Sequence, residues 1–179
     1  SIGDSLLNFF TESEIKENIE DYYDNYKINK FYAVEIYQHK KFEVYDSVQF
    51  SLKVNDKDYI IYHVVGLIFY ENNINRCYEK QKKIVKELTF LFKNVEKSNW
   101  KKKHEADKSG NSKSTVVEFW FENGDLARVI CTDWSKEFPE KFSSQIKFQA
   151  CPKELEEKTI KKDKKSIFFI LFLDCYFLC

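Results

Sequence analysis

Methionine is absent from the 179-residue chain, and proline and glycine are scarce, with two and four residues. No stretch rich in proline or glycine marks a linker, and the length suits one ordinary domain with its own core. We therefore predict a single α+β domain over residues 1–150. Because no initiator methionine is present, we expect the chain to begin after a cut, either by signal-peptide removal or by truncation, which permits export.

Arginine is nearly missing, since only Arg76 and Arg128 interrupt an otherwise lysine-only set of 29 cationic residues. The 29 acidic residues bring the net charge to zero. The chain thus lacks the basic excess with which nucleic-acid binders neutralise phosphates, and we expect no nucleic-acid partner. One local basic run is a candidate interaction surface: Trp100, Lys101, Lys102 and Lys103. Such a run is also typical of a solvated loop.

Complete catalytic motifs are missing as well. Gly3-Asp4-Ser5-Leu6 resembles the nucleophile block of the GDSL esterases, and the likeness implies Ser5 as nucleophile. In that family a strand precedes the serine and an Asp-x-x-His supplies the base; this chain shows neither. Glu35, Glu43 and Glu118 are scattered carboxylates without visible pairing for acid–base work, and His63 lies inside a predicted strand, where a packed histidine is more common than a ligand. We identify no catalytic residue and favour a protein that is not an enzyme.

Metal and cofactor motifs are equally incomplete. No C-x-x-C or H-E-x-x-H occurs, and Cys175 and Cys179 have no further ligands beside them for a zinc site. The segment 110–114 lacks the glycine and the Gly-Lys-Ser/Thr end of a phosphate loop. We identify no metal-binding or cofactor-binding residue.

The first half of the chain predicts a helix followed by three strands. Thr11 and Glu14 fit a capping box, which predicts a helix over 12–26. β-Forming residues and alternating hydrophobicity then predict strands over 31–38, 42–54 and 59–70. Gly66 inside the third of these indicates a bulge or a close approach by another element.

The second half predicts a long helix and a hairpin. Apolar residues recur at helical spacing over 74–95, a polar loop follows over 96–114, and strands are expected over 116–121 and 126–132. We predict an α+β fold: an antiparallel sheet of about five strands in β-β-β-α-β-β order, with the long amphipathic helix on one face and an N-terminal helix.

Asn123-Gly124 between the last two strands favours a two-residue type I′ turn. That turn places Trp120 opposite Ala127 and puts Val116, Trp120, Ala127, Val129 and Cys131 on one sheet face. The other face of the hairpin is also apolar, so either face could meet the helix.

Five cysteines make an odd number, so at least one has no partner within the chain. Cys77 lies on the apolar face of the long helix and Cys131 on an apolar hairpin face. These two are a candidate disulfide, on condition of an oxidising compartment. Two buried thiols are the alternative.

The C-terminal residues differ from the rest of the chain. Residues 151–165 are highly charged and predict a helix, whereas 166–179 form an apolar tail. The tail is shorter than the roughly 20 residues that span a bilayer, so we expect no transmembrane span. It is compatible with a buried terminal strand or with contact to an anionic membrane surface.

Two resemblances follow from these patterns. The element order resembles that of the type III secretion chaperones, which implies a cytoplasmic dimer that holds an unfolded client. The segments 1–7, 119–125 and 131–135 look like those of small, uncharacterised exported proteins of marine bacteria with AT-rich genomes. That likeness implies export, for example to the periplasm, and supplies no activity.

Four functions stay open at this point. A non-catalytic protein-binding module, with an unknown protein partner or as a homodimer, would show a large exposed apolar patch. A small apolar-ligand binder would enclose an aromatic pocket between sheet and helix. A cytosolic chaperone-like protein would hold an unfolded segment. An enzyme would need His63 or a carboxylate with a strongly shifted pKa in a cleft.

Overall fold

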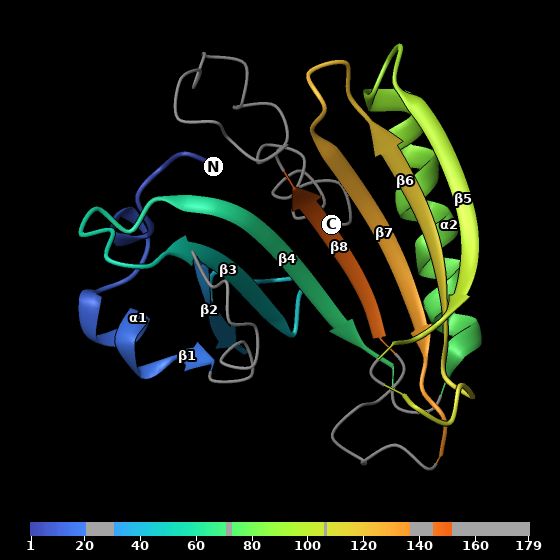
Figure 1. Ribbon diagram of the computed structural model, residues 1–179, viewed down its shortest axis with the longest axis horizontal. Coiled ribbons are helices and arrows are strands. Elements are labelled where there is room, and N and C mark those ends of the chain that lie inside the picture. The colour runs from blue at the N-terminus through green and yellow to red at the C-terminus, as the bar shows by residue number, and fades with distance from the viewer. Residues whose placement is uncertain (21–30, 71–72, 106, 137–144, 152–179) are drawn as a thin grey trace. The chain divides into compact units, whose positions relative to one another are not determined.

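The computed structural model describes residues 1–20, 31–70, 73–105, 107–136 and, by their backbone, 145–151 (Figure 1). Two compact units divide the chain. The first comprises residues 1–66 with Ala150 and Cys151, and the second comprises residues 67–149.

The first unit is built on an antiparallel sheet with strand order β1-β2-β3-β4. Its strands are β1 (Ile19–Glu20), β2 (Phe31–Tyr37), β3 (Ser47–Lys53) and β4 (Ile61–Phe69). Val34 lies opposite Phe50, and Glu35 lies opposite Gln49. Because neighbouring residues point to opposite faces, one face carries the buried apolar residues and the other carries buried polar residues.

Short N-terminal helices belong to the apolar face of this sheet. These are the 3₁₀ helix η1 (Leu6–Asn8) and helix α1 (Glu12–Glu17). Leu6 and Ile15 are fully buried, and the ring of Phe10 lies 6.1 Å from that of Phe50. Burial of these side chains fastens the helices, because helices this short are not stable on their own.

The predicted capping box at Thr11 is present, but the predicted length of the helix is wrong. Helix α1 ends at Glu17, where the side chain of Asn18 donates to the carbonyl of Glu14. The carbonyl of Asn18 accepts the backbone N–H of Glu35, so the chain leaves the helix to pair as strand β1. Residues 21–26 of the predicted helix lie outside the described residues.

Gly66 marks a close approach, in line with one of the two alternatives for this position. A Cβ added there would lie 2.4 Å from the ring of Tyr45. That distance is too short for any real side-chain contact, so the aromatic ring packs directly on the backbone of β4 where only glycine leaves room.

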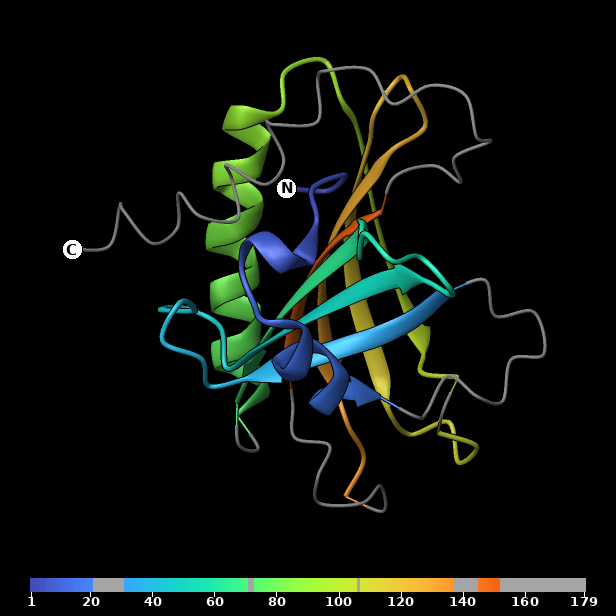
Figure 2. The same ribbon diagram turned by 90° about the vertical axis from the view of Figure 1, so that its left-hand side faces the viewer.

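The second unit combines one long helix with a second antiparallel sheet. Helix α2 (Ile74–Leu91) is followed by β5 (Glu96–Lys103), β6 (Lys113–Trp120) and β7 (Leu126–Asp133), in strand order β7-β6-β5. Strand β8 (Gln145–Cys151) comes last in the chain. Figures 1 and 2 show α2 lying along one face of the β5–β7 sheet.

The apolar stripe of α2 predicted its buried face. Cys77, Gln81, Ile84 and Leu88 are buried at helical spacing. Gln81 is polar, and its amide donates to the carbonyls of Thr115 and Val129, 2.9 Å away in each case. These bonds satisfy a buried amide.

The prediction of one sheet of about five strands is wrong, whereas the α+β class and the antiparallel pairing are confirmed. The sheets have four and three strands, and the N-terminal helix is minor. Strand β5 falls in the segment 96–114 that we predicted as a loop. Its sequence carries no apolar alternation because both faces of this strand are largely exposed.

The predicted hairpin between β6 and β7 is present with a different turn. The N–H of Gly124 donates to the carbonyl of Phe121, and the N–H of Phe121 to the carbonyl of Asp125. Of the two expected turn residues only Gly124 has positive φ, +83°. This is a three-residue loop, which shifts the pairing by one residue, so that Trp120 lies opposite Leu126 and not Ala127.

The two C-terminal predictions concern residues outside the described ranges. These are the helix over 151–165 and the apolar tail over 166–179. Of these residues only Cys151 is described, as the end of β8. The single-domain assignment of 1–150 stays a prediction. Within the described residues no helix has both the length and the hydrophobicity to cross a membrane.

Candidate functional site

The candidate surface Trp100–Lys103 lies on β5, the last strand of the β5–β7 sheet. Its residues pair with β6, with Trp100 opposite Val116 and Lys103 opposite Lys113. Of the eight residues of β5 only Ser98 and Trp100 are partly covered; the other six are exposed. The sequence run therefore forms an exposed edge strand eight residues long, not a loop.

Two hydrogen bonds show which peptide groups of β5 point away from β6. The N–H of His104 donates to the carbonyl of Ser112, so even-numbered residues of β5 bond to β6. The bond from the N–H of Phe121 to the carbonyl of Asp125 agrees with this assignment. It shows that the peptide groups of odd-numbered residues of β6 bond to β7, which leaves those of even-numbered residues to bond to β5. Four residues consequently direct their N–H and C=O groups outward: Lys97, Asn99, Lys101 and Lys103.

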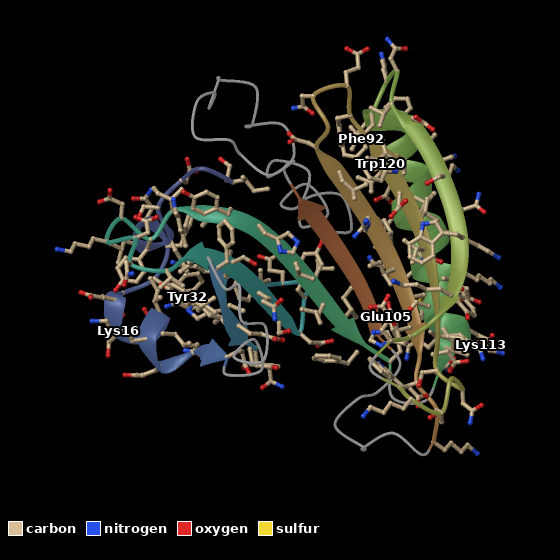
Figure 3. All side chains as sticks on the ribbon, viewed as in Figure 1. Lys16, Tyr32, Phe92, Glu105, Lys113 and Trp120 are labelled. Atoms are coloured by element: carbon tan, nitrogen blue, oxygen red, sulfur yellow. A yellow bond between two sulfur atoms is a disulfide. The ribbon has the colours of Figure 1, made fainter. Side chains whose placement is uncertain are left out.

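The side chains of β5 alternate between the two faces of the sheet. Lys97 reaches toward α2, with its Nζ 3.5 Å from Thr89 Oγ1. On the other face Lys102 Nζ lies 5.2 Å from the ring centre of Trp100 and 3.0 Å from Glu105 Oε1. The Lys102 hydrogen bond lowers the pKa of Glu105. Figure 3 shows Glu105 at one end of these strands and Phe92 and Trp120 at the other.

An ion pair with a buried carboxylate and a half-exposed arginine occupies the sheet face opposite α2. Ser98, Glu118 and Arg128 are direct cross-strand neighbours on β5, β6 and β7. Arg128 Nε donates to Glu118 Oε1 at 2.7 Å, and the Glu118 side chain is 7% exposed. Ser98 Oγ and Trp120 Nε1 donate to Glu118 Oε2 at 3.2 and 3.3 Å. The carboxylate is thus surrounded by donors.

Those donors decide the ionisation of Glu118. Burial by itself would raise the pKa of Glu118. The hydrogen bonds from Trp100 and Arg128, the positive charge of Arg128 and the hydroxyl of Ser98 outweigh burial, so the pKa lies below its ordinary value. The ion pair is therefore intact at neutral pH.

The turn that joins β5 to β6 is fixed by Asp107. Its carboxylate accepts hydrogen bonds from the N–H of Ser109 and from the N–H and Oγ of Ser112, at 2.9, 2.8 and 2.6 Å. These bonds lower the pKa of Asp107. Ser112 Oγ also accepts the N–H of Ser135, 2.9 Å away. The weak phosphate-loop resemblance of 110–114 belongs to this structural turn.

Cys77 and Cys131 are joined by a disulfide, with 6.0 Å between their Cα atoms. The three-residue hairpin loop changes which residues accompany Cys131. Val117 and Phe119, and not Val116 and Trp120, share the helix-facing side with Ala127, Val129 and Cys131. The prediction that Cys131 faces the helix is correct, so that Cys131 reaches Cys77. The prediction of which β6 residues face the helix is wrong.

A second polar cluster lies in the first unit, on the face of β2 and β3 that carries Glu35. Glu35 is 5% exposed and accepts hydrogen bonds from Ser47 Oγ at 2.7 Å and Gln49 Nε2 at 3.1 Å. Burial, together with the charge of Glu35, raises the pKa of Tyr37. His63 Nδ1 lies 3.1 Å from Ser51 Oγ. Ser47 and Gln49 on β3 thus both donate to this carboxylate.

The residues considered for chemistry do not assemble into a recognised centre. Ser5 Oγ donates to the carbonyl of Asp58 and accepts from the N–H of Leu7. It therefore caps helix η1, and neither of these partners is a catalytic base. Within the described ranges no group of three or more histidine, cysteine or acidic residues is placed to hold a metal ion.

Sequence reasoning missed the Glu118–Arg128 pair and the strand character of 96–103. The pair follows from the hairpin register, because a three-residue loop around Gly124 places Arg128 opposite Glu118. No comparable signal exists for β5, whose residues are polar or charged except for Trp100, so that no apolar alternation marks a strand. Compared with known protein families, with curated proteins and with solved structures, the chain has no match.

Proposed function

We propose that this protein is a non-catalytic binding domain that takes up an extended acidic segment of another protein along β5. The observation that carries the proposal is the exposed eight-residue edge strand with four outward-pointing peptide groups. A chain that lies beside β5 would complete these hydrogen bonds and extend the sheet, which is a common mode of peptide recognition.

The charge of β5 supports an acidic partner. Four lysines and one glutamate lie within the strand, in a chain whose net charge is zero. Only two of the lysines have described partners on this unit: Lys97 with Thr89, and Lys102 with Glu105. Acidic side chains on the added strand would be attracted to Lys101 and Lys103, and this attraction would raise the association rate.

The same charges disfavour a homodimer through this edge. Antiparallel pairing of two β5 strands would set lysines against lysines, and directly opposed like charges destabilise a sheet. Lysines on an edge strand also prevent indiscriminate pairing. A partner of opposite charge overcomes that barrier, so the lysines make the edge selective.

Other observations favour this function over its alternatives. The disulfide, the amide of Gln81 and the buried side chains of Ile84 and Leu88 occupy the contact between α2 and its sheet, where a small apolar ligand would have to bind. The disulfide also favours an oxidising compartment such as the periplasm over a cytosolic chaperone.

The proposal is tested by fluorescence anisotropy with a labelled peptide of four Glu-Val repeats. The Asn99→Pro variant removes one outward N–H and leaves the bonds between β5 and β6 in place. We expect its affinity to fall at least about tenfold while the melting temperature changes little. Lys101→Glu with Lys103→Glu should weaken binding further, whereas Lys80→Glu with Lys83→Glu, on α2, is the matched charge control.

Three results would overturn the proposal. The first is equal affinity of the Asn99→Pro variant and the wild type. The second is equal binding of a Lys-Val repeat peptide. The third is an equal loss of affinity in the α2 control, which would reduce binding to general charge attraction.

A further inference from the structure

Arg128 has donor groups that bind none of the described residues. Its Nε is bound to Glu118, and the contacts of the described residues give its two terminal nitrogens no hydrogen bond. The side chain is 31% exposed, so these nitrogens are within reach of solvent. We propose that Arg128 binds the carboxylate of a small aromatic or similarly flat acid on the sheet face opposite α2, a site separate from the β5 edge.

The choice of arginine at this position supports a geometric role. Only two of the 29 cationic residues in the chain are arginines, so lysine is the ordinary cation of this protein. A lysine could also pair with Glu118. Arginine differs because its planar fork can give one nitrogen to Glu118 and still present two parallel N–H groups to a second carboxylate.

Glu118 acts as the positioning residue. Its carboxylate receives Arg128 Nε, Ser98 Oγ and Trp120 Nε1. The side chain is nearly buried, so it holds the guanidinium of Arg128 in a fixed plane. One negative charge remains close by, which favours a singly charged carboxylate over a phosphate dianion.

Trp120 provides an apolar surface beside this polar row. Its N–H is held by Glu118, and 40% of the residue is exposed (Figure 3). The ring therefore has a fixed orientation and an uncovered surface. Leu126 lies directly opposite Trp120 on β7, two residues before Arg128 on the same face. A flat acid whose carboxylate meets Arg128 would place its apolar part against Trp120.

The experiment follows the three tryptophan indole N–H signals by ¹H–¹⁵N NMR while benzoate is added to the whole protein. We expect the Trp120 signal to shift, together with that of Trp100, which also contacts Glu118. The Trp134 signal should stay, since its ring packs against His104, 4.2 Å away. Benzamide, which has the same shape without the charge, and phosphate should each bind at least about tenfold more weakly than benzoate.

Variants separate the fork from simple charge. Arg128→Lys keeps a cation beside Glu118, and we expect it to bind benzoate at least about tenfold more weakly with an unchanged overall spectrum. Arg76→Lys, on α2, is the matched control and should bind as the wild type does. The inference is overturned if benzoate leaves Trp120 unmoved, if benzamide or phosphate binds equally well, or if Arg128→Lys binds benzoate normally. None of these results bears on peptide binding at β5.

Discussion

The two sheets of this protein share a plan and differ in how each is finished. Each has an apolar face covered by helix and an opposite face with a nearly buried carboxylate, Glu35 in one and Glu118 in the other. The first sheet ends in the two-residue strand β1, and its carboxylate accepts hydrogen bonds from Ser47 and Gln49. The second ends in the eight-residue strand β5 and pairs its carboxylate with Arg128. The second unit thus contains both the terminal nitrogens of Arg128, which bind none of the described residues, and the exposed edge strand β5.

The covering helices are also fastened differently. Helix α1 depends on the capping box at Thr11 and on burial of Ile15. Helix α2 is tied to its sheet by the disulfide between Cys77 and Cys131 and by the Gln81 amide. This covalent tie resists local opening of α2 from the sheet.

Removal of the disulfide should have the largest effect on this comparison. Cys77 and Cys131 are separated by 54 residues, and closing a loop of that length is worth about 4 kcal/mol in the free energy of unfolding. We expect Cys77→Ser with Cys131→Ser to lose about that much in urea unfolding. Hydrogen exchange should rise in α2 and β7 more than in β2 and β3.

A reductant supplies the control for this experiment. It should destabilise the wild type and leave the double variant unchanged. If the double variant were as stable as the oxidised wild type, the disulfide would have no part in fastening α2.

The two carboxylates should respond unequally to neutral replacement. Glu118→Gln leaves the guanidinium of Arg128 without its anion, and we expect a loss of about 1–3 kcal/mol in unfolding free energy. Glu35→Gln should cost less than about 1 kcal/mol, because the neighbouring hydroxyl of Ser47 and amide of Gln49 can reorient around a neutral group. Urea unfolding of both variants at neutral pH measures the difference, and equal losses would contradict the contrast.

Acid should reduce the effect of the Glu118 substitution. The folded pKa of Glu118 lies below its ordinary value of 4.5, so its contribution is fully present above that value and disappears as the pH falls through the folded pKa. We therefore expect the stability gap between wild type and Glu118→Gln to narrow as the pH is lowered from about 7 to about 3. A constant gap over this range would show that the carboxylate does not act through its charge.

The smallest effect should come from the helix cap in the first unit. Thr11→Ala removes the hydroxyl that accepts the N–H of Glu14, and we expect a loss of about 1 kcal/mol in thermal or urea unfolding. Ser13→Ala, which removes only an exposed bond to Glu17, should change stability by less than about 0.5 kcal/mol. The two variants together test whether the cap, and not general helix polarity, holds α1.

Local patterns in the sequence predicted several elements correctly. The capping box predicted the start of α1, the apolar stripe predicted α2, and alternation predicted β3. Gly124 predicted a hairpin, and the placement of Cys77 and Cys131 predicted their bridge. Each of these depends on residues close together in the chain or on the period of one element, so that each can be read from the chain itself.

The tertiary structure decided what depends on pairing. Both turn geometries suit Asn123-Gly124, and only the partner strands and α2 determine which of Val116 or Val117 faces the helix. The end of α1 is set by pairing of Ile19 with Val34. Strand β5 has no apolar period because an edge strand with two solvated faces needs none.

The candidate sites belong to this second category. The sequence alone showed a lysine-rich run near Trp100 and, in Arg128, one of two arginines, and it did not show how these residues lie relative to one another. Register brought Ser98, Glu118 and Arg128 into one row and turned the peptide groups of Asn99 and its odd-numbered neighbours outward. The physical reason is that hydrogen-bond direction and side-chain facing alternate with a period of two, so a single residue of register decides both.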